Sequence, residues 1–386
     1  MLLTKKTSIC TESIAFGSMI YYKDKKYNFV EYFDETTGFL ARSNILSNGI
    51  ETDIEPNMRS FPELVDFGIM GHCDACSEGL CRSVGVDCYQ NAAVRSRPNM
   101  TVQEYSKLVR QCKGKTFQIA LGGAGDPNKH EEFEEILRLS RENSIVPNLT
   151  TSGFALNDTE IDLIQKYCGA VAVSFYSKLD SDGKESNQLT MTAIERFIEA
   201  GCCTNIHFVL GKHNIDEAIY RVKNRLFPQD INAVVFLLYK ATGQARKENV
   251  LSGNDPKYIE FLKLVNSNTG SLQMGFDSCQ SPAINKFCFD VATETIEFCD
   301  SARFSMYIDC DLMAYPCSFG HDFSSFAVDL SQNTIKEAWE SKEFEHFRYL
   351  QTKQCDECIH KNCRPCALGM LPNMCGLDMS RKVQSK

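Results

Sequence analysis

Short apolar runs alternate with amphipathic segments through the middle of the chain, from about residue 61 to residue 245. The apolar runs predict six strands, at 64–70, 117–121, 145–151, 171–176, 205–210 and 233–239. The segments between them have apolar residues at helical spacing and predict helices at 101–112, 130–139, 158–167, 192–200 and 215–226. Alternating strands and helices predict a parallel sheet with helices on its outside. Six units are fewer than the eight of a closed barrel. We therefore expect an α/β fold built on a partial (β/α)6 TIM-like barrel over residues 61–245.

Residues 1–60 have a different pattern and predict a short, β-rich lead-in. Two apolar stretches, 18–22 and 27–33, flank the polar turn 23–26, which is typical of a hairpin. The segment is too short to bury a large core of its own.

The chain beyond the predicted barrel changes character twice. Residues 246–270 predict a linker that includes a helix at 258–265. Residues 271–386 are rich in loops and cysteines, with a strand expected at 304–308 and a helix at 335–350. We expect this last region to form a small second domain.

Charge and hydropathy narrow the class of protein. The net charge of −9 gives no electrostatic reason to expect a nucleic-acid partner. The sequence contains no apolar run long enough for a membrane span, and its polar N-terminus does not resemble a secretory signal. We expect a cytoplasmic protein that has no membrane partner.

Cysteine is the unusual component, with 19 residues. In a reducing cytoplasm, so many cysteines indicate metal binding rather than disulfides. Four lie within 73–88 and ten within 279–375. The other five are interpreted as small buried apolar residues, and they are Cys10, Cys112, Cys168, Cys202 and Cys203.

The first cysteine group directly follows the first predicted barrel strand, where the chemistry of such folds is found. It contains Cys73, Cys76, Cys81 and Cys88. Three thiolates are enough to hold three irons of a four-iron cluster, which leaves the fourth iron open for a substrate or cofactor. The candidate ligand sets are Cys73, Cys81 and Cys88, or Cys73, Cys76 and Cys81. A zinc knuckle that uses all four thiolates is the structural alternative.

This group resembles the cluster-binding loop of radical S-adenosylmethionine (SAM) enzymes. Cys88, followed by the aromatic Tyr89, resembles the last ligand position of that loop. The resemblance favours Cys73, Cys81 and Cys88 as the ligands of a SAM-binding 4Fe–4S cluster, with Cys76 as a spare. Seven and six residues separate these three cysteines, whereas the usual loop has three and two. The chain therefore resembles a subgroup with an expanded loop.

A glycine-rich segment, Leu121-Gly-Gly-Ala-Gly-Asp-Pro127, ends the second predicted strand. Glycines allow a backbone to approach a ligand closely, although a tight turn would also explain them. The segment resembles the radical SAM motif that contacts the methionine amino group. It has Ala124 where the family usually has an acidic residue, and Asp126 comes two positions later. The resemblance implies that the cofactor-binding residues are Tyr89, Gly122, Gly123, Ala124, Asp126, Thr151, Ser152 and Ser174. Ordinary hydrogen bonding is the alternative for the polar residues at the strand ends.

The second cysteine group resembles the SPASM domain, the auxiliary-cluster extension of peptide-modifying radical SAM enzymes. Its C-terminal spacing is Cys-x2-Cys-x4-Cys-x2-Cys, with two internal gaps one residue shorter than in the family pattern, and Leu312 stands where a glycine is usual. The resemblance implies two auxiliary 4Fe–4S clusters. Cys355, Cys358, Cys363 and Cys375 would hold one of them. Cys299, Cys317, Cys366 and either Cys279 or Cys288 would hold the other. A zinc site is the alternative, although four residues between the two pairs is short for a zinc ribbon.

The two resemblances together imply an enzyme that cleaves SAM reductively and abstracts hydrogen from a peptide or small protein. The expected activity is maturation of a ribosomally made peptide through a thioether or carbon–carbon crosslink. A flavodoxin- or ferredoxin-type protein would supply the electron. A sulfatase-type formylglycine maturase is the alternative within the class. A non-catalytic iron–sulfur electron carrier and a zinc-stabilised binding module are alternatives outside it.

Overall fold

The structure is a computed structural model of the 386-residue chain. It describes residues 3–7, 11–16, 18–52, 54, 56–76, 79–94, 96–268, 270–288, 291, 296–353, 364, 366–369 and 374. The proposed cluster ligands Cys355, Cys358, Cys363 and Cys375 lie outside these residues.

An antiparallel sheet of five strands forms the N-terminal part of the chain, with its strands in sequence order. The strands are β1 (Leu3–Thr7), β2 (Thr11–Phe16), β3 (Met19–Asp24), β4 (Phe29–Asp34) and β5 (Leu40–Asn44). The predicted hairpin is confirmed as β3 and β4. Tyr22 and Phe33 pack against Phe117 of the next region, so this sheet shares a core with the barrel.

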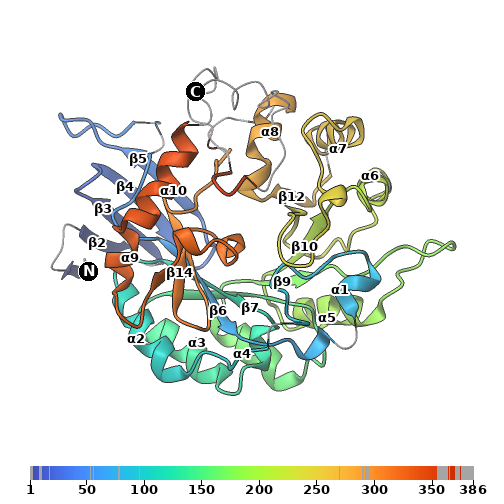
Figure 1. Cartoon of the computed structure of the whole chain (residues 1–386), viewed down its shortest axis with the longest axis horizontal. Coiled ribbons are helices and arrows are strands. Elements are labelled where there is room, and N and C mark those ends of the chain that lie inside the picture. The colour runs from blue at the N-terminus through green and yellow to red at the C-terminus, as the bar shows by residue number, and fades with distance from the viewer. Residues whose placement is uncertain are drawn as a thin grey trace.

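A second sheet of ten strands contains all six predicted barrel strands, in parallel. They are β6 (Leu64–Met70), β7 (Gln118–Gly123), β8 (Val146–Thr151), β9 (Val171–Ser174), β10 (Thr204–Leu210) and β11 (Ala233–Leu238). The five helices between them are α2 (Val102–Cys112), α3 (Phe133–Glu142), α4 (Asp158–Tyr167), α5 (Gln188–Glu199) and α6 (Ile215–Asn224). Figure 1 shows the helices around the outside of the curved sheet.

Residues from the C-terminal region extend this sheet at both edges. β12 (Gln273–Phe276) pairs in parallel with β11, and β13 (Ser305–Ile308) pairs in parallel with β6. Beyond β13 come the antiparallel strands β14 (Met313–Tyr315) and β15 (Val328–Asp329). Strands from both sides of residues 245 and 270 therefore belong to one sheet. The domain boundaries expected at these two positions stay predictions.

Alternation along the strands gives the sheet two different faces. In β10, Ile206 and Phe208 are buried, whereas Asn205, His207 and Val209 are partly exposed on the other face. Successive strand residues point to opposite faces of a sheet. The buried apolar face packs under the helices, and the mixed polar and apolar face lines the interior.

The remaining helices are α1 (Leu80–Ser83), α7 (Pro256–Asn266), α8 (Ser281–Phe287), α9 (Ile335–Trp339) and α10 (Lys342–Lys353). The single helix expected at 335–350 is wrong, because the chain breaks it into α9 and α10. The Ser341 hydroxyl accepts a hydrogen bond from the Phe344 amide at 3.3 Å and begins a new helix there. In the described parts of the chain, no helix is long and apolar enough to cross a bilayer.

Buried ion pairs connect the N-terminal sheet to the barrel. Arg59, just before β6, lies 2.9 Å from Glu31 of β4, and Arg42 of β5 forms an ion pair with Glu63. The Trp339 indole of α9 donates a hydrogen bond to the Arg59 carbonyl at 3.0 Å. Figure 1 shows α9 and α10 beside this blue sheet. The lead-in is therefore anchored to both later regions.

Candidate metal centres

The first cysteine loop begins where β6 ends and returns to the same place. The Arg97 amide donates to the Gly71 carbonyl at 3.0 Å, and the Gly71 amide donates to the Asn99 side chain at 2.9 Å. A Cβ on Gly71 would lie 2.3 Å from the Pro98 carbonyl oxygen, so only glycine permits this closure. The loop is thereby held over the carboxyl end of β6.

All four thiols of this loop lie near one another. Burial raises the pKa of Cys73 to about 12, with smaller contributions from nearby Asp126, Cys76 and Cys88. Burial also raises the pKa of Cys81, with Cys88 and Cys76 contributing. Cys81 lies in α1, which Gly79 precedes in the left-handed conformation with a φ of 62°. Gly79 therefore supplies the left-handed turn from which the helix that carries Cys81 begins.

Burial without a metal favours the protonated thiols, and bound iron would stabilise the thiolate form that ligates it. In the part of the chain that the structure describes, no group of three or more Cys, His, Asp or Glu converges on a single metal ion. A four-iron cluster needs a wider arrangement, because each cysteine binds a different iron. The closeness of all four thiols does not choose among them, and Cys73, Cys81 and Cys88, with Cys76 as the spare, stay a prediction.

The glycine-rich segment at the end of β7 packs against the start of this loop. The Ala124 amide donates to the Met70 carbonyl at 2.8 Å, and Gly123 has a φ of 125°. A Cβ on Gly125 would lie 2.3 Å from the His72 carbonyl oxygen and 3.1 Å from the Cys73 Cα. In contrast, a Cβ on Gly122 would have no described neighbour within 4 Å. Gly123 and Gly125 therefore allow the two segments to pack closely, whereas Gly122 borders open space.

Two predicted cofactor residues are joined beside this segment. Asp126 accepts hydrogen bonds from the Ser152 amide at 2.9 Å and from the Ser152 hydroxyl at 2.5 Å. Burial raises the pKa of Asp126, and these hydrogen bonds oppose the shift. Thr151 is fully buried and accepts from the Gly153 amide at 3.0 Å. The structure brings Asp126 and Ser152 close to Cys73, and their role toward SAM stays a prediction.

Two further residues of the barrel interior were not assigned from the sequence. Tyr176, just beyond β9, is half-buried near Cys81, Asp126 and Cys88, and loss of solvation raises its pKa. The predicted Ser174 hydrogen-bonds with this tyrosine. His207 of β10 lies 3.5 Å from the Thr150 hydroxyl, and burial lowers its pKa to about 4. The sequence indicated only that these two residues occupy alternating strand positions. Such alternation does not tell whether a side chain faces the barrel interior or the ordinary surface.

Four cysteines of the second group also gather, from segments far apart in the sequence. Cys279, in the turn after β12, is near Cys299 and Cys317, and both of these are near Cys366. Burial is the largest cause of the raised pKa in Cys279, Cys299 and Cys317. The site therefore forms between two ends of the ten-stranded sheet.

Cys288 does not share this location. It is buried in the apolar core, and its sulfur lies 3.7 Å from the Leu262 carbonyl oxygen. The two choices left open by the sequence therefore differ in the structure, and the geometry favours Cys279 as the fourth ligand.

An aromatic contact connects the two cysteine sites. The ring of Tyr89, next to Cys88, lies 4.9 Å from the ring of Phe319, centroid to centroid. Phe319 follows Cys317 by two residues. Tyr89 thus lies toward the second site, and its predicted contact with SAM stays a prediction.

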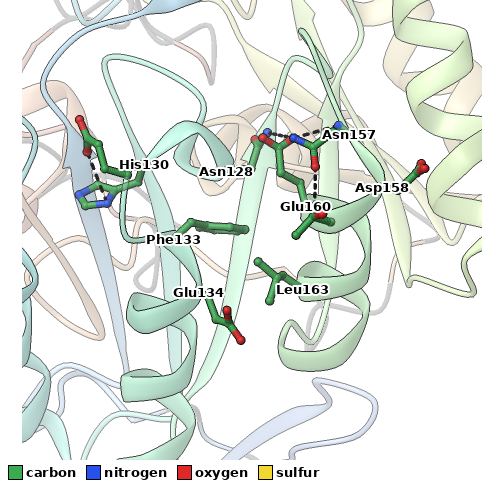
Figure 2. A pocket seen from close by; sticks show the side chains of 10 residues that line it. Asn128, His130, Phe133, Glu134, Asn157, Asp158, Glu160 and Leu163 are labelled. Atoms are coloured by element: carbon green, nitrogen blue, oxygen red, sulfur yellow. Dashed lines mark hydrogen bonds and ion pairs between the residues drawn. The ribbon is translucent and has the colours of Figure 1, made fainter.

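A hollow of about 570 Å³ lies elsewhere, between the N-terminal ends of α3 and α4. Figure 2 shows Glu160 held there by Asn128 and Asn157. Acidic residues in a first helical turn are ordinary, because they complement the helix dipole. None of the predicted site residues lines this hollow, and it does not belong to the site.

The region of the second cysteine group matches a known domain family. Residues 299–367 match the family model of SPASM, an iron–sulfur cluster-binding domain. The chain carries a SPASM domain. The matched region includes Cys299, Cys317 and Cys366, three of the four gathered cysteines. No curated protein matches the sequence as a whole.

Solved structures share the fold at low identity. Streptococcus suis SuiB bound to S-adenosylmethionine is 14% identical, with a TM-score of 0.60 over 83% of this chain and 78% of SuiB. SuiB bound to its precursor peptide SuiA is 13% identical, with a TM-score of 0.63 over 88% and 91%. AnSMEcpe with bound AdoMet is 16% identical, with a TM-score of 0.56 over 81% and 93%. These matches confirm the expected fold class, a partial α/β barrel followed by a SPASM domain.

Proposed function

We propose that this protein is a radical SAM enzyme that matures a peptide, forming a thioether or carbon–carbon crosslink. The observation that carries the proposal is the cysteine loop closed over β6, packed against a glycine-rich β7 end and followed by a SPASM domain. The similar structures support it, since SuiB was solved with S-adenosylmethionine and with a precursor peptide, and anSMEcpe with AdoMet and peptides.

The residues of the first site have distinct tasks in this proposal. Cys73, Cys81 and Cys88 would hold a 4Fe–4S cluster with one open iron, and this cluster would supply the electron for reductive cleavage of bound SAM and for hydrogen abstraction from the substrate. The backbone of 122–124 and the Asp126–Ser152 pair orient the bound cofactor. The closed loop and the sheet beneath it exclude water from the reactive species.

Metal content is the first test. Anaerobically reconstituted protein should bind about 12 irons, from three four-iron clusters. Zinc at stoichiometric amounts with only traces of iron would overturn the proposal in favour of a zinc-stabilised binding module.

Cofactor cleavage is the second test. Reduced protein with SAM should release 5′-deoxyadenosine without any peptide, and a flavodoxin- or ferredoxin-type protein should replace dithionite as reductant. A fully loaded, reducible protein that releases none would be an electron carrier. With the true peptide, mass spectrometry should show loss of two hydrogen atoms per crosslink. An aldehyde at a Cys or Ser would instead indicate a formylglycine maturase.

A further inference from the structure

The segment that follows β11 touches both cysteine sites. Its Gln244 amide donates to the Cys88 carbonyl at 3.0 Å, and the Gln244 side chain accepts from Arg82 at 3.0 Å. Gly243 approaches the first loop so closely that a Cβ would lie 2.4 Å from the Tyr89 carbonyl oxygen. The far end of this segment is therefore fixed against the first site.

The near end of the same segment is Lys240, whose side chain points to the second site. Lys240 is only 7% exposed. Its Nζ donates to Asp277 at 2.6 Å and to the Leu238 carbonyl at 3.1 Å, and it lies 4.4 Å from the centre of the Phe319 ring. Asp277 precedes Cys279 by two residues, and Phe319 follows Cys317 by two. The ammonium group is thus enclosed between the segments that carry two of the four gathered thiols.

Two further hydrogen bonds hold Asp277 in place independently of Lys240. It accepts from the Leu238 amide at 3.1 Å and from the Gln280 side chain at 3.0 Å. Lys240 Nζ lies between the Phe319 ring, two residues from Cys317, and Asp277, two residues from Cys279. The ammonium group therefore presents a positive charge to the second site, which the Asp277 carboxylate reduces on the Cys279 side.

A fixed positive charge stabilises the reduced form of a nearby cluster, because reduction adds a negative charge. In a buried site this interaction is weakly screened. The Phe319 ring that covers Lys240 also contacts Tyr89, so the same charge lies on the side of the auxiliary site that faces the first site.

We propose that Lys240 is a positioning residue that raises the reduction potential of the auxiliary cluster held by Cys279, Cys299, Cys317 and Cys366. The inference rests on the proposed function, because it requires iron–sulfur clusters at both sites. With this charge beside it, the auxiliary cluster would accept an electron more readily than it would without the lysine.

The test is an EPR-monitored redox titration of the reconstituted full-length chain. In Lys240→Met, the auxiliary signal should titrate at a lower potential, with the reduced-to-oxidised ratio at the wild-type midpoint falling about tenfold, which is 59 mV for one electron. Lys240→Arg keeps the charge and should stay near wild type. Lys257→Met removes an exposed lysine of α7 and should change nothing. The SAM-responsive signal of the first cluster should keep its potential in every variant.

An auxiliary potential that is the same in Lys240→Met and wild type, at full iron content, would overturn the inference. If Lys240→Met fails to load, Asp277→Asn decides, since removing the neighbouring negative charge must raise the potential. An unchanged or lowered potential there also overturns it. A wild-type chain without auxiliary iron would instead refute the proposed function, so the two failures are distinguishable.

Discussion

The two cysteine sites are built in opposite ways. All four thiols of the first site come from one loop, 73–88, whose ends meet at Gly71 and Arg97. The thiols of the second site come from four segments, at 279, 299, 317 and 366. A short loop fixes its own ligands through local turns, whereas a dispersed set needs the whole sheet to bring it together. The first site is therefore set by local sequence, and the second by tertiary structure.

Single thiol substitutions in the first loop should have the largest effects. Cys88→Ala should abolish the SAM-responsive EPR signal and the formation of 5′-deoxyadenosine, because the proposed three-cysteine set would lose one of its iron ligands. Cys76→Ala should keep both. Cys203→Ala, which removes an exposed cysteine, is the matched control. If activity survives in Cys88→Ala and vanishes in Cys76→Ala, then Cys73, Cys76 and Cys81 are the ligands.

The corresponding change in the second site contrasts two cysteines nine positions apart. Cys279→Ala should lower the iron content by up to about four atoms of about 12, because the auxiliary cluster would lose one of its four proposed ligands. Cys288→Ala should keep the full content and lose only about 1 kcal/mol of stability, as expected for a small buried side chain. Iron analysis and urea unfolding measure the two effects. Equal iron loss in both variants would contradict the placement of Cys288 in the core.

The same division between local and dispersed features separates what the sequence predicts from what it does not. The barrel strands were predictable because buried parallel strands are continuous apolar runs, such as Ala233–Leu238. The left-handed turn at Gly79, directly before the helix that carries Cys81, follows from local sequence as well. Such features depend on residues a few positions apart, which is the range that pattern reasoning covers.

Features that depend on distant partners were not predictable. The strand at 304–308 was expected, but its pairing with β6 leaves no trace in either segment. β12 is only four residues long, too short for its own periodicity to show. Lys240 and Asp277 are 37 positions apart, and each looks like an ordinary surface charge until the fold buries them together. The choice between Cys279 and Cys288 depended on the same kind of information.

Acid should weaken the barrel beneath the first site through His207. Its pKa is about 4 in the folded protein, against 6.5 when unperturbed, because burial outweighs the attraction of Asp277. The unfolded chain therefore binds a proton that the folded chain does not, and stability falls as pH decreases from 6.5 toward 4. The loss in the free energy of unfolding has an upper limit of about 3 kcal/mol. The true loss is smaller than this limit, because the His207 ring lies on the partly exposed interior face.

His207→Gln should flatten this dependence. Anaerobic urea unfolding between pH 5.5 and 7.5 measures the difference between variant and wild type, which cancels the acid lability of the clusters themselves. His346→Gln, at an exposed position of α10, is the control and should keep the wild-type slope. Equal slopes in wild type and His207→Gln would show that this ring titrates normally.

The smallest expected effect concerns a hydrogen bond that supports only the second site. The Tyr258 hydroxyl of α7 donates to the Gln280 side chain at 2.9 Å, and both residues are fully buried. Gln280 in turn donates to the Phe236 carbonyl at 2.6 Å and to Asp277 at 3.0 Å, so it fixes the turn that presents Cys279. Tyr258→Phe removes the donor and leaves a buried acceptor unpaired, which costs about 1–2 kcal/mol.

Because that turn serves the dispersed site alone, Tyr258→Phe should separate the two clusters under mild denaturation. In an anaerobic urea series, the auxiliary EPR signal should disappear at a lower concentration than in wild type, while the SAM-responsive signal keeps its midpoint. Tyr220→Phe, which alters a tyrosine exposed on α6, should shift neither signal. A parallel shift of both signals would mean that the two sites unfold as one unit, and the contrast between a local and a dispersed site would then not extend to their stability.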